Sequence, residues 1–356
     1  MKKRVVVGMS GGVDSSVAAA LLKAKGYEVI GVTMCFNLAS SSRKKIGCCS
    51  LQGIEDARRV AHKLGIRHYV LNMQKALEEK VIKNFCEEYL AGRTPNPCVL
   101  CNQYLKFGDL LGKARLLDAE FLATGHYARI AKTRQGFLLA KAKDAKKDQS
   151  YFLYRLKQTQ LKQIIFPLGN YTKEEVRGLA RKFKLPVAEK KASQEICFLP
   201  NDDYRAFLKA RIGKDILPGP VIDSEGNIAG QHKGIAYYTI GQREGLGIAK
   251  GYPVYITRIA PKSNTIFIGS QNEALKREFL VKDLYFSLKT PLKKKIALKV
   301  KIRYNHQESN AEIYPFASQA KIIFKKTQFA ITPGQSAVFY SQGRVLGGAI
   351  IDQVIG

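Results

Sequence analysis

Long apolar runs are missing from this chain of 356 residues, and none approaches the length of a membrane-spanning helix. The apolar stretch that follows Lys2-Lys3-Arg4 is likewise too short for the core of a signal peptide. These two absences predict a cytoplasmic protein with no membrane partner. The length is sufficient for two or three domains, each with its own core.

Acidic residues are also scarce, because 29 Asp and Glu stand against 59 Lys and Arg, which gives a net charge of +30. A surplus of this size favours a polyanionic partner such as nucleic acid, bound in a salt-sensitive way. The basic residues are spread along the chain and do not gather in one tail. A lysine-rich composition that follows the base composition of a genome would give the same surplus, so the charge alone leaves both explanations open.

The chain has seven cysteines, so they cannot all be paired in disulfides. In a cytoplasmic protein an odd number argues against a disulfide framework. Cys98 and Cys101 form a Cys-x-x-Cys pair. Neither a second such pair nor a nearby His-x-His is present, so a structural zinc site with four ligands is not expected. The cysteines therefore indicate redox, sulfur or metal chemistry, or burial in a core.

The most informative segment that is present is Ser10–Ser16, with the sequence Ser-Gly-Gly-Val-Asp-Ser-Ser. It lies between a short apolar run and a run with helical character, which predicts a strand, a tight turn and a helix start. Gly11 and Gly12 allow backbone angles that other residues resist. The N–H groups at the helix start form an anion site, to which Ser15 and Ser16 add hydroxyl donors. The segment is predicted to bind phosphate.

This segment is not a Walker loop, because no Gly-Lys-Ser/Thr follows it. No lysine is placed there to hold a γ-phosphate during phosphoryl transfer. The segment resembles the pyrophosphate loop of the ATP-pyrophosphatase families. That resemblance implies cleavage of ATP between its α- and β-phosphates and attachment of AMP to an oxygen of the substrate. An ordinary glycine turn of an α/β protein is the structural alternative.

Strand-like and helix-like segments alternate over residues 1–203, which predicts an α/β catalytic domain with a doubly wound parallel sheet. Ligands bind such sheets at the carboxyl ends of the strands, where Ser10, Met34 and Gly125-His126 are expected to lie. We expect strands at 4–9, 27–34, 67–71 and 120–124, and helices at 54–64, 75–90 and 105–117.

The pattern changes after Asn201. A short helix at 202–212 and a glycine-rich stretch at 213–251 predict a small β-rich central domain over residues 204–272. Alternating strands then indicate a closed barrel or a sandwich, and we predict a C-terminal β-barrel over residues 273–356. The strands are expected at 281–288, 296–304, 311–315, 320–325, 337–340 and 345–351.

A second informative segment is Thr94–Asn102, with the sequence Thr-Pro-Asn-Pro-Cys-Val-Leu-Cys-Asn. Its two prolines bias the residues before them toward an extended form. The spacing of Cys98 and Cys101 brings both thiols to one side of a turn or of a first helical turn. Cys197, within Ile-Cys-Phe, is by itself typical of a small buried apolar residue.

Six sequence motifs, taken together, indicate which family of proteins these cysteines belong to. The chain resembles the tRNA-specific 2-thiouridylases, bacterial enzymes that make 2-thiouridine at the wobble position of the anticodon, from Val5 to about Ile351. The motifs occur in the order Ser-Gly-Gly-Val-Asp-Ser-Ser, Thr-Pro-Asn-Pro-x-x-x-Cys-Asn, Ala-Thr-Gly-His-Tyr, Lys-Asp-Gln-Ser-Tyr-Phe-Leu, Ile-Cys-Phe and Gly-Gln-Arg-x-Gly-Leu-Gly.

The chemistry of such a reaction fits the residues. An adenylate makes the uridine oxygen a leaving group, and a cysteine persulfide supplies a strong sulfur nucleophile. The resemblance implies ATP and Mg²⁺, tRNA as partner, and a sulfur source such as a persulfide donor, a sulfur-relay protein or a desulfurase. It further implies that Cys197 carries the persulfide and that Cys101 releases the sulfur through a transient disulfide.

Two sets of binding residues are also implied by the resemblance. Asp14 is either a contact to Mg²⁺ or an acid that stabilises the helix start, and both readings stay open. The residues implied in ATP binding are Gly8, Met9, Ser10, Gly11, Gly12, Val13, Asp14, Ser15, Met34 and Gly125. Those implied in tRNA binding are Asn96, Pro97, Cys98, His126, Lys147, Asp148, Gln149, Arg303, Tyr304 and Gln335.

Cys98 departs from the family pattern, because well-known members have aspartate at this position. A role proposed for that carboxylate cannot be transferred unchanged. Cys98, Cys101 and Cys197 could instead ligate three irons of a [4Fe-4S] cluster whose fourth iron binds hydrosulfide. We expect Cys86 to lie in a core, and Cys35, Cys48 and Cys49 to be structural or incidental.

Two other functions remain to be weighed. Argininosuccinate, NAD and GMP synthetases share this loop type and use amine nucleophiles, but they need no paired cysteines and no basic β-barrel. A nucleic-acid-binding module with a metal-ligating Cys-x-x-Cys pair would leave the segment Ser10–Ser16 unexplained. The sequence therefore favours the thiolation reaction.

Overall fold

The computed structural model describes residues 2–36, 51–191, 196–248, 250–287 and 294–355. Its internal contacts divide the chain into two compact units. Unit 1 comprises Met1–Val81, Pro97–Asp203 and Gln342–Leu346, and unit 2 comprises Ile82–Asn96, Tyr204–Ser341 and Gly347–Gly356. Within the described ranges, no helix combines the length and apolar character needed to cross a bilayer.

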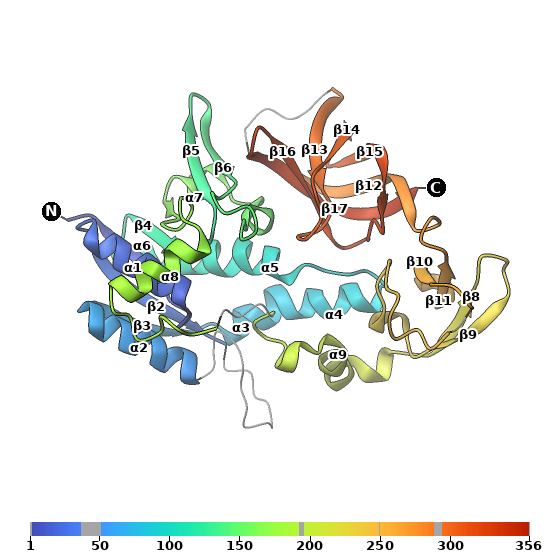
Figure 1. The fold of residues 1–356 in the computed structure, drawn as a ribbon, viewed down its shortest axis with the longest axis horizontal. Coiled ribbons are helices and arrows are strands. Elements are labelled where there is room, and N and C mark those ends of the chain that lie inside the picture. Colours follow the sequence, from blue (N-terminus) through green and yellow to red (C-terminus); the bar gives the residue numbers. More distant parts are fainter. Residues whose placement is uncertain (1, 37–50, 192–195, 249, 288–293, 356) are drawn as a thin grey trace. The chain divides into compact units, whose positions relative to one another are not determined.

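Unit 1 is built on a parallel sheet, drawn mainly in blue and cyan in Figure 1. Val5 and Val7 of its central strand are fully buried, as expected for a strand covered on both faces. The strands lie in the order β3 (Arg67–Asn72), β2 (Glu28–Cys35), β1 (Arg4–Gly8), β4 (Phe121–Thr124) and β7 (Ile164–Ile165).

Helices cover both faces of this sheet. Val5 and Val7 pack in one buried cluster with residues of α1 (Val13–Ala24), α2 (Leu51–Leu64) and α8 (Lys173–Lys182). Side chains alternate along a strand, so Gly8 faces the opposite side, where a Cβ would lie 3.7 Å from Leu110 of α6 (Leu110–Arg115). The predicted doubly wound α/β domain is confirmed.

Between β4 and α8 the structure contains elements that the sequence analysis did not predict. A hairpin of β5 (Arg129–Thr133) and β6 (Gly136–Ala140) lies there, followed by α7 (Gln158–Leu161), and none of these was expected from the sequence. Within unit 1, β6 also pairs with Arg344 and Val345.

Two of the expected helices contain π-helical turns. The segment predicted at 75–90 forms α3 (Gln74–Leu77), a π-helical turn at Glu78–Ile82 and α4 (Lys83–Leu90). The segment predicted at 105–117 begins earlier, at α5 (Pro97–Leu100), and continues as a π-helix over Cys101–Asp109 before α6. A π-helix changes which side chains share a face, so this difference matters for the site.

In unit 2, a small sheet follows the helix α9 (Tyr204–Ile212). Its core includes Val221, Ile256 and Ile266, all of which are buried. The strands lie in the order β10 (Tyr255–Ala260), β11 (Thr265–Gly269), β8 (Gly219–Ile222) and β9 (Ile228–His232). This sheet confirms the predicted β-rich central part.

Among the described residues, six antiparallel strands of the C-terminal part close into a barrel, because β12 pairs with both β15 and β17. The buried rings of Phe279 and Phe324 stack inside it, with centroids 5.7 Å apart. The predicted β-barrel is confirmed. Around the barrel the strands are β12 (Leu275–Phe286), β15 (Gln319–Phe329), β14 (Ser309–Phe316), β13 (Ile296–Lys301), β16 (Ser336–Ser341) and β17 (Arg344–Ile355).

Candidate functional site

The nucleotide loop, which we define as Ser10–Ser16, follows β1 and includes the first turn of α1. Gly11 has φ of +71°, and a Cβ there would lie 2.1 Å from the Gly53 carbonyl oxygen of α2, so only glycine fits. Gly12 occupies the N-cap of α1 and offers no side-chain cap to the N–H groups that follow it. The helix start therefore presents backbone donors without an internal side-chain acceptor, as an anion site requires.

The serine hydroxyls of the nucleotide loop act differently from the expectation. Ser16 Oγ donates to the Gly12 carbonyl at 2.8 Å, and Ser15 Oγ donates to the same oxygen at 3.2 Å. Ser15 Oγ also accepts from the Ser10 backbone N–H at 3.1 Å. In this structure both hydroxyls hold the turn together, so they are not free to donate to an anion as the sequence led us to expect.

Gly125 closes the nucleotide loop from the neighbouring strand β4. A Cβ at Gly125 would lie 2.7 Å from the Ser15 nitrogen and 2.8 Å from the Asp14 carbonyl carbon. The backbone after β4 therefore lies directly against the first turn of α1, at the point where the strand order of the sheet reverses. Such switch points are where doubly wound sheets bind their ligands.

Asp14 is held by two partners. Its Oδ1 accepts from the Lys173 ammonium at 2.6 Å and from the Tyr127 hydroxyl at 2.8 Å. The Lys173 side chain is 11% exposed and the Asp14 side chain 33% exposed, so the ion pair is partly shielded from water. Burial, followed by the charge and hydrogen bond of Asp14, raises the pKa of Tyr127 far above its ordinary value. The phenol stays protonated and donates to the carboxylate.

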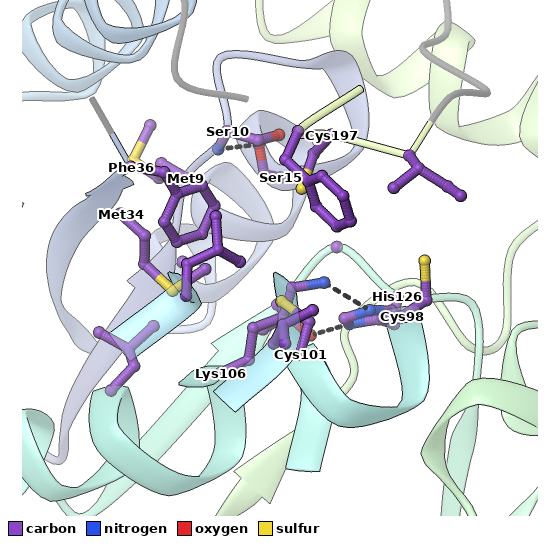
Figure 2. A pocket seen from close by; sticks show the side chains of 18 of the residues that line it. Met9, Ser10, Ser15, Met34, Phe36, Cys98, Cys101, Lys106, His126 and Cys197 are labelled. Atoms are coloured by element: carbon purple, nitrogen blue, oxygen red, sulfur yellow. Dashed lines mark hydrogen bonds between the residues drawn. The ribbon is translucent and has the colours of Figure 1, made fainter. Parts of the chain in front are cut away.

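One pocket at this edge of the sheet brings the nucleotide loop and the cysteines together (Figure 2). Its volume is about 280 Å³, and Cys98, Cys101 and Cys197 all line it. Cys101 is buried, whereas Cys98 and Cys197 are half-buried. Other residues expected in the site that line this pocket are Gly8, Met9, Ser10, Asp14, Ser15, Met34, Pro97, Gly125, His126 and Gln149.

His126 is fixed and neutral in this pocket. Its Nδ1 lies 2.7 Å from Thr124 Oγ1, and its Nε2 lies 3.4 Å from Lys106 Nζ (Figure 2). An ammonium only donates, so Nε2 accepts from Lys106 and Nδ1–H donates to Thr124. Burial, and next the Lys106 charge, hold the pKa of His126 well below its usual range.

Lys106 is a pocket residue that the sequence analysis missed. Among the described residues that line the pocket, it is the one lysine or arginine. It follows Cys101 by five positions, and the π-helix Cys101–Asp109 turns both side chains toward the same pocket. The closeness of Lys106 to the Cys-x-x-Cys pair in the sequence could have indicated a shared site. A helical periodicity of 3.6 residues, however, does not place positions 101 and 106 on the same face.

Several residues expected to contact tRNA make structural hydrogen bonds in unit 1. Asp148 is buried, and its carboxylate accepts from the Ala142 N–H at 2.9 Å and from the Ser150 hydroxyl at 2.7 Å. Gln149 Oε1 accepts from the Tyr127 N–H at 2.9 Å. Lys147 is half-buried and lies outside the pocket lining.

The other residues expected to contact tRNA lie in unit 2. Gln335 Nε2 donates to the carbonyls of Thr94 and Pro95 at 2.9 and 3.2 Å, and Arg303 donates to the Phe329 carbonyl at 3.0 Å and to that of Ala330. Lys301 Nζ lies 5.5 Å from the Tyr304 ring centroid. Asn96 is half-buried in the same unit.

The remaining cysteines do not line the pocket. Cys86 is buried in α4, which confirms the core position expected for it, and Cys35 is half-buried at the end of β2. Cys48 and Cys49 lie outside the described residues, as do Ser193–Glu195. Across the residues that the structure does describe, no three His, Cys, Asp or Glu side chains are arranged to hold a metal ion.

Three family models match consecutive parts of the chain. The family model described as "tRNA methyl transferase HUP domain" matches residues 3–201. Residues 205–270 match "tRNA methyl transferase PRC-barrel domain", and residues 276–351 match "Aminomethyltransferase beta-barrel domain".

Full-length relatives carry a consistent name. "tRNA-specific 2-thiouridylase MnmA 1" of Caldanaerobacter subterraneus subsp. tengcongensis is 51% identical over 100% of this chain and 99% of its own length. "tRNA-specific 2-thiouridylase MnmA" of Halothermothrix orenii is 51% identical over 98% of this chain and 99% of its own. The protein of the same name from Acetivibrio thermocellus is 48% identical over 98% and 99%. This identity over nearly the full length shows that the chain belongs to the tRNA-specific 2-thiouridylase family.

Proposed function

We propose that this chain replaces the C2 oxygen of the wobble uridine of tRNA by sulfur, with ATP cleaved to AMP and pyrophosphate. The observation that carries the proposal is a pocket in unit 1 whose lining combines residues of the nucleotide loop with Gly125 and with the three cysteines, namely Ser10, Asp14, Ser15, Gly125, Cys98, Cys101 and Cys197. ATP chemistry and sulfur chemistry need to share a site in this reaction. The names of the full-length relatives support the same activity.

The first step is activation of the uridine. Its O2 attacks the α-phosphorus of ATP, the bond to the β-phosphate breaks, pyrophosphate leaves, and the N3 proton is lost. The backbone donors at the start of α1 hold the phosphates. Lys106 contributes a cation on the wall that carries Cys101, where it can stabilise charge on the α-phosphate and on departing AMP.

Mg²⁺, when bound with ATP, would neutralise charge on the phosphates and would be held largely by phosphate oxygens and water. Asp14 is the one carboxylate among the described residues that line the pocket, so it is the side chain that would reach the ion. Its ion pair with Lys173 limits that role, because the ammonium already lies 2.6 Å from Oδ1. We therefore propose that Asp14 mainly positions the start of α1.

The second step is sulfur transfer. A persulfide donor first loads Cys197. The Cys101 thiolate then attacks the inner sulfur of the Cys197 persulfide, which forms a Cys101–Cys197 disulfide and releases hydrosulfide. Hydrosulfide adds at C2, AMP leaves with the electrons of the C–O bond, and the proton of the hydrosulfide is transferred to N3, which restores the N3–H group. A thiol reductant returns the disulfide to two thiols with two electrons and two protons.

The sequence analysis left open two sulfur sources, a cysteine persulfide and an iron–sulfur cluster. The arrangement of the side chains that could ligate iron favours the persulfide. Cys98, Cys101 and Cys197 line one pocket, yet within the described residues no set of three donors has the spacing of a metal site. We derive no step through a cluster. Anaerobic iron and sulfide analysis of active protein tests this choice, since stoichiometric iron that tracks with activity would overturn the persulfide route.

Recognition of tRNA is proposed for Asn96, Pro97, Cys98, His126, Lys147, Asp148, Gln149, Arg303, Tyr304 and Gln335. The net charge of +30 supports contact with a polyanion. For Asp148 the contact would come from its backbone, because its buried carboxylate is occupied by the turn that it stabilises.

A Cys197→Ser variant tests the sulfur role. It should form no 2-thiouridine when tRNA nucleosides are analysed by mass spectrometry after incubation with ATP, Mg²⁺ and a sulfur source, while tRNA binding stays largely intact. Cys35→Ser is the matched control, because Cys35 does not line the pocket. Normal thiolation by Cys197→Ser would contradict the assignment. The same spectra separate thiolation from the methylation that the family descriptions mention.

A further inference from the structure

Lys190 connects the nucleotide loop to two other parts of unit 1. Its ammonium donates to the Gly11 carbonyl oxygen at 3.0 Å and to Asp56 Oδ2 at 2.6 Å. The residue follows α8 in a segment whose Leu185 and Val187 are buried in the cluster that also contains residues of α1. The base of the Lys190 side chain is therefore anchored independently of the loop that its ammonium holds.

Asp56 is a buried acceptor in α2. Its side chain is 4% exposed, and its carboxylate also accepts from Gln52 Nε2 at 3.1 Å and from Arg59. Burial alone would raise the pKa of Asp56, but the hydrogen bonds from Lys190, Arg59 and Gln52 outweigh it and lower the pKa below its ordinary value. The carboxylate stays charged at neutral pH and fixes the Lys190 ammonium in place.

The same helix touches the nucleotide loop directly. Gly11 lies so close to Gly53 that a Cβ on Gly11 would be 2.1 Å from the Gly53 carbonyl oxygen. Gly53 and Asp56 are three residues apart in α2 and so lie on one side of it. The loop is thus held at Gly11 from two directions, by the backbone of α2 and by the Lys190 ammonium.

We propose that Lys190 and Asp56 form a latch that sets the direction of the Gly11–Gly12 peptide for nucleotide binding. In a trans peptide the C=O and the following N–H point in opposite directions. With its Gly11 carbonyl bound to Lys190, the peptide turns the Gly12 N–H away from Lys190 and toward the phosphates. Lys190 is a positioning residue that acts through the loop without contacting ATP.

This inference rests on the proposed function in one respect, that the nucleotide loop binds ATP. It assigns to ATP binding a lysine that lies outside the pocket lining and 179 residues from Gly11 in the chain. Charge-assisted hydrogen bonds to a carbonyl and a carboxylate contribute enough that loss of the latch should weaken ATP binding by about tenfold.

The experiment measures ATP binding directly by calorimetry on the full chain without tRNA, so its outcome does not depend on thiolation. Lys190→Met and Asp56→Asn should each raise the Kd for ATP about tenfold, and the double variant should be no weaker than either single variant, since the two residues act as one unit. Lys190→Arg should restore binding to within about threefold, because it keeps the charge and the donors. In steady state, KM for ATP should rise while kcat changes little.

Two neighbours serve as matched controls. Lys191→Met and Glu55→Gln change exposed residues adjacent to Lys190 and Asp56, and neither should alter ATP binding. Thermal unfolding accompanies each measurement. If Asp56→Asn fails to fold, the pair Lys190→Met and Lys190→Arg still tests the latch, because the Lys190 side chain is 35% exposed and the buried Asp56 carboxylate keeps Arg59 and Gln52 as donors.

Three outcomes would overturn the proposal. Unchanged ATP binding by folded Lys190→Met would remove the latch. Weak binding by Lys190→Met together with normal binding by Asp56→Asn would show that Asp56 plays no part and would contradict a latch made of both residues. A wild-type chain that binds no ATP would contradict both the latch and the proposed function, whereas ATP binding without thiolation would contradict the proposed function alone.

Discussion

Gly125 is the residue at which the smallest change should disturb the site most. Its Cα lies against the first turn of α1, and a methyl group there would lie 2.7 Å from the Ser15 nitrogen and 2.8 Å from the Asp14 carbonyl carbon. Those backbone atoms belong to the first turn of α1, where we propose that the phosphates bind. They cannot move aside as a flexible side chain would, because α1 is buried in the core of unit 1.

We therefore predict that Gly125→Ala weakens ATP binding at least about tenfold while the fold is retained, because the start of α1 must shift to accept the methyl group. The control is Gly112→Ala in α6, where a Cβ meets nothing within 4 Å. That change should leave ATP binding unaltered and raise stability by up to about 1 kcal/mol. Calorimetric titration with ATP distinguishes the two, and equal binding by both variants would refute the role of Gly125.

At Asp14, the structure bears on one of two residue-level expectations, because the carboxylate lies in the first turn of α1, whereas the contact to Mg²⁺ stays a prediction. The sequence left open a contact to Mg²⁺ and an acid at a helix start. The carboxylate does lie in the first turn of α1, and it also lines the pocket, but Lys173 and Tyr127 already bind it. Neither partner could be assigned from the sequence, because they stand 113 and 159 residues away along the chain.

At the scale of secondary structure, the π-helix Cys101–Asp109 decides which residues reach the pocket. A regular α-helix would align Cys101 with Leu105, which is fully buried. The wider π-helical turn instead brings Lys106 to the face that carries Cys101. An element that looked like a plain amphipathic helix in the sequence thereby supplies both a thiol and a cation to the same site.

We predict that Lys106→Met lowers kcat for 2-thiouridine formation about 100-fold, because the variant removes the cation that lines the proposed active-site pocket with Cys101. Lys113→Met in α6 is the control, since Lys113 is exposed and lies outside the pocket lining. Single-turnover measurement of AMP release with bound tRNA provides the readout. Full activity in Lys106→Met would show that the cation plays no part in the reaction.

For the whole molecule, the histidines predict how stability depends on pH. Burial is the largest cause that lowers the pKa of His68, His126, His232 and His306 below the ordinary value of 6.5. These side chains stay neutral in the folded chain but take up protons in the unfolded chain below that pH. The unfolded state then binds more protons, so the free energy of unfolding falls as the pH falls.

Accordingly, the melting temperature should be level near pH 7 to 8 and should drop by at least about 2 °C between pH 7 and pH 5. Carboxylates with lowered pKa, such as Asp56 and Asp352, contribute a further loss only at more acidic pH. Scanning calorimetry across this range checks the prediction. A His126→Asn variant should show a shallower loss, and a melting temperature that rises toward pH 5 would contradict the argument.

Much of this protein is determined by the sequence alone. The strand, glycine turn and helix around Ser10 are local features, since they depend on glycine angles and on apolar periodicity within a few residues. The parallel sheet and the C-terminal barrel follow from repeated local patterns. The domain boundaries at 203 and 272 stay predictions, and the roles of the individual site residues do as well.

Only the tertiary structure decides which distant residues complete the site. Lys190 at Gly11, Lys173 at Asp14 and Gly125 against Ser15 are contacts between segments that no local pattern relates, because chain packing and not sequence spacing brings them together. The sequence analysis also missed the hairpin β5–β6 and the π-helix that directs Lys106 to the pocket. The reason is related, because tertiary packing can override the local periodicity of the sequence. The loop Ser10–Ser16 is formed by seven consecutive residues, whereas the contacts that Lys190, Lys173 and Gly125 make with it depend on the fold.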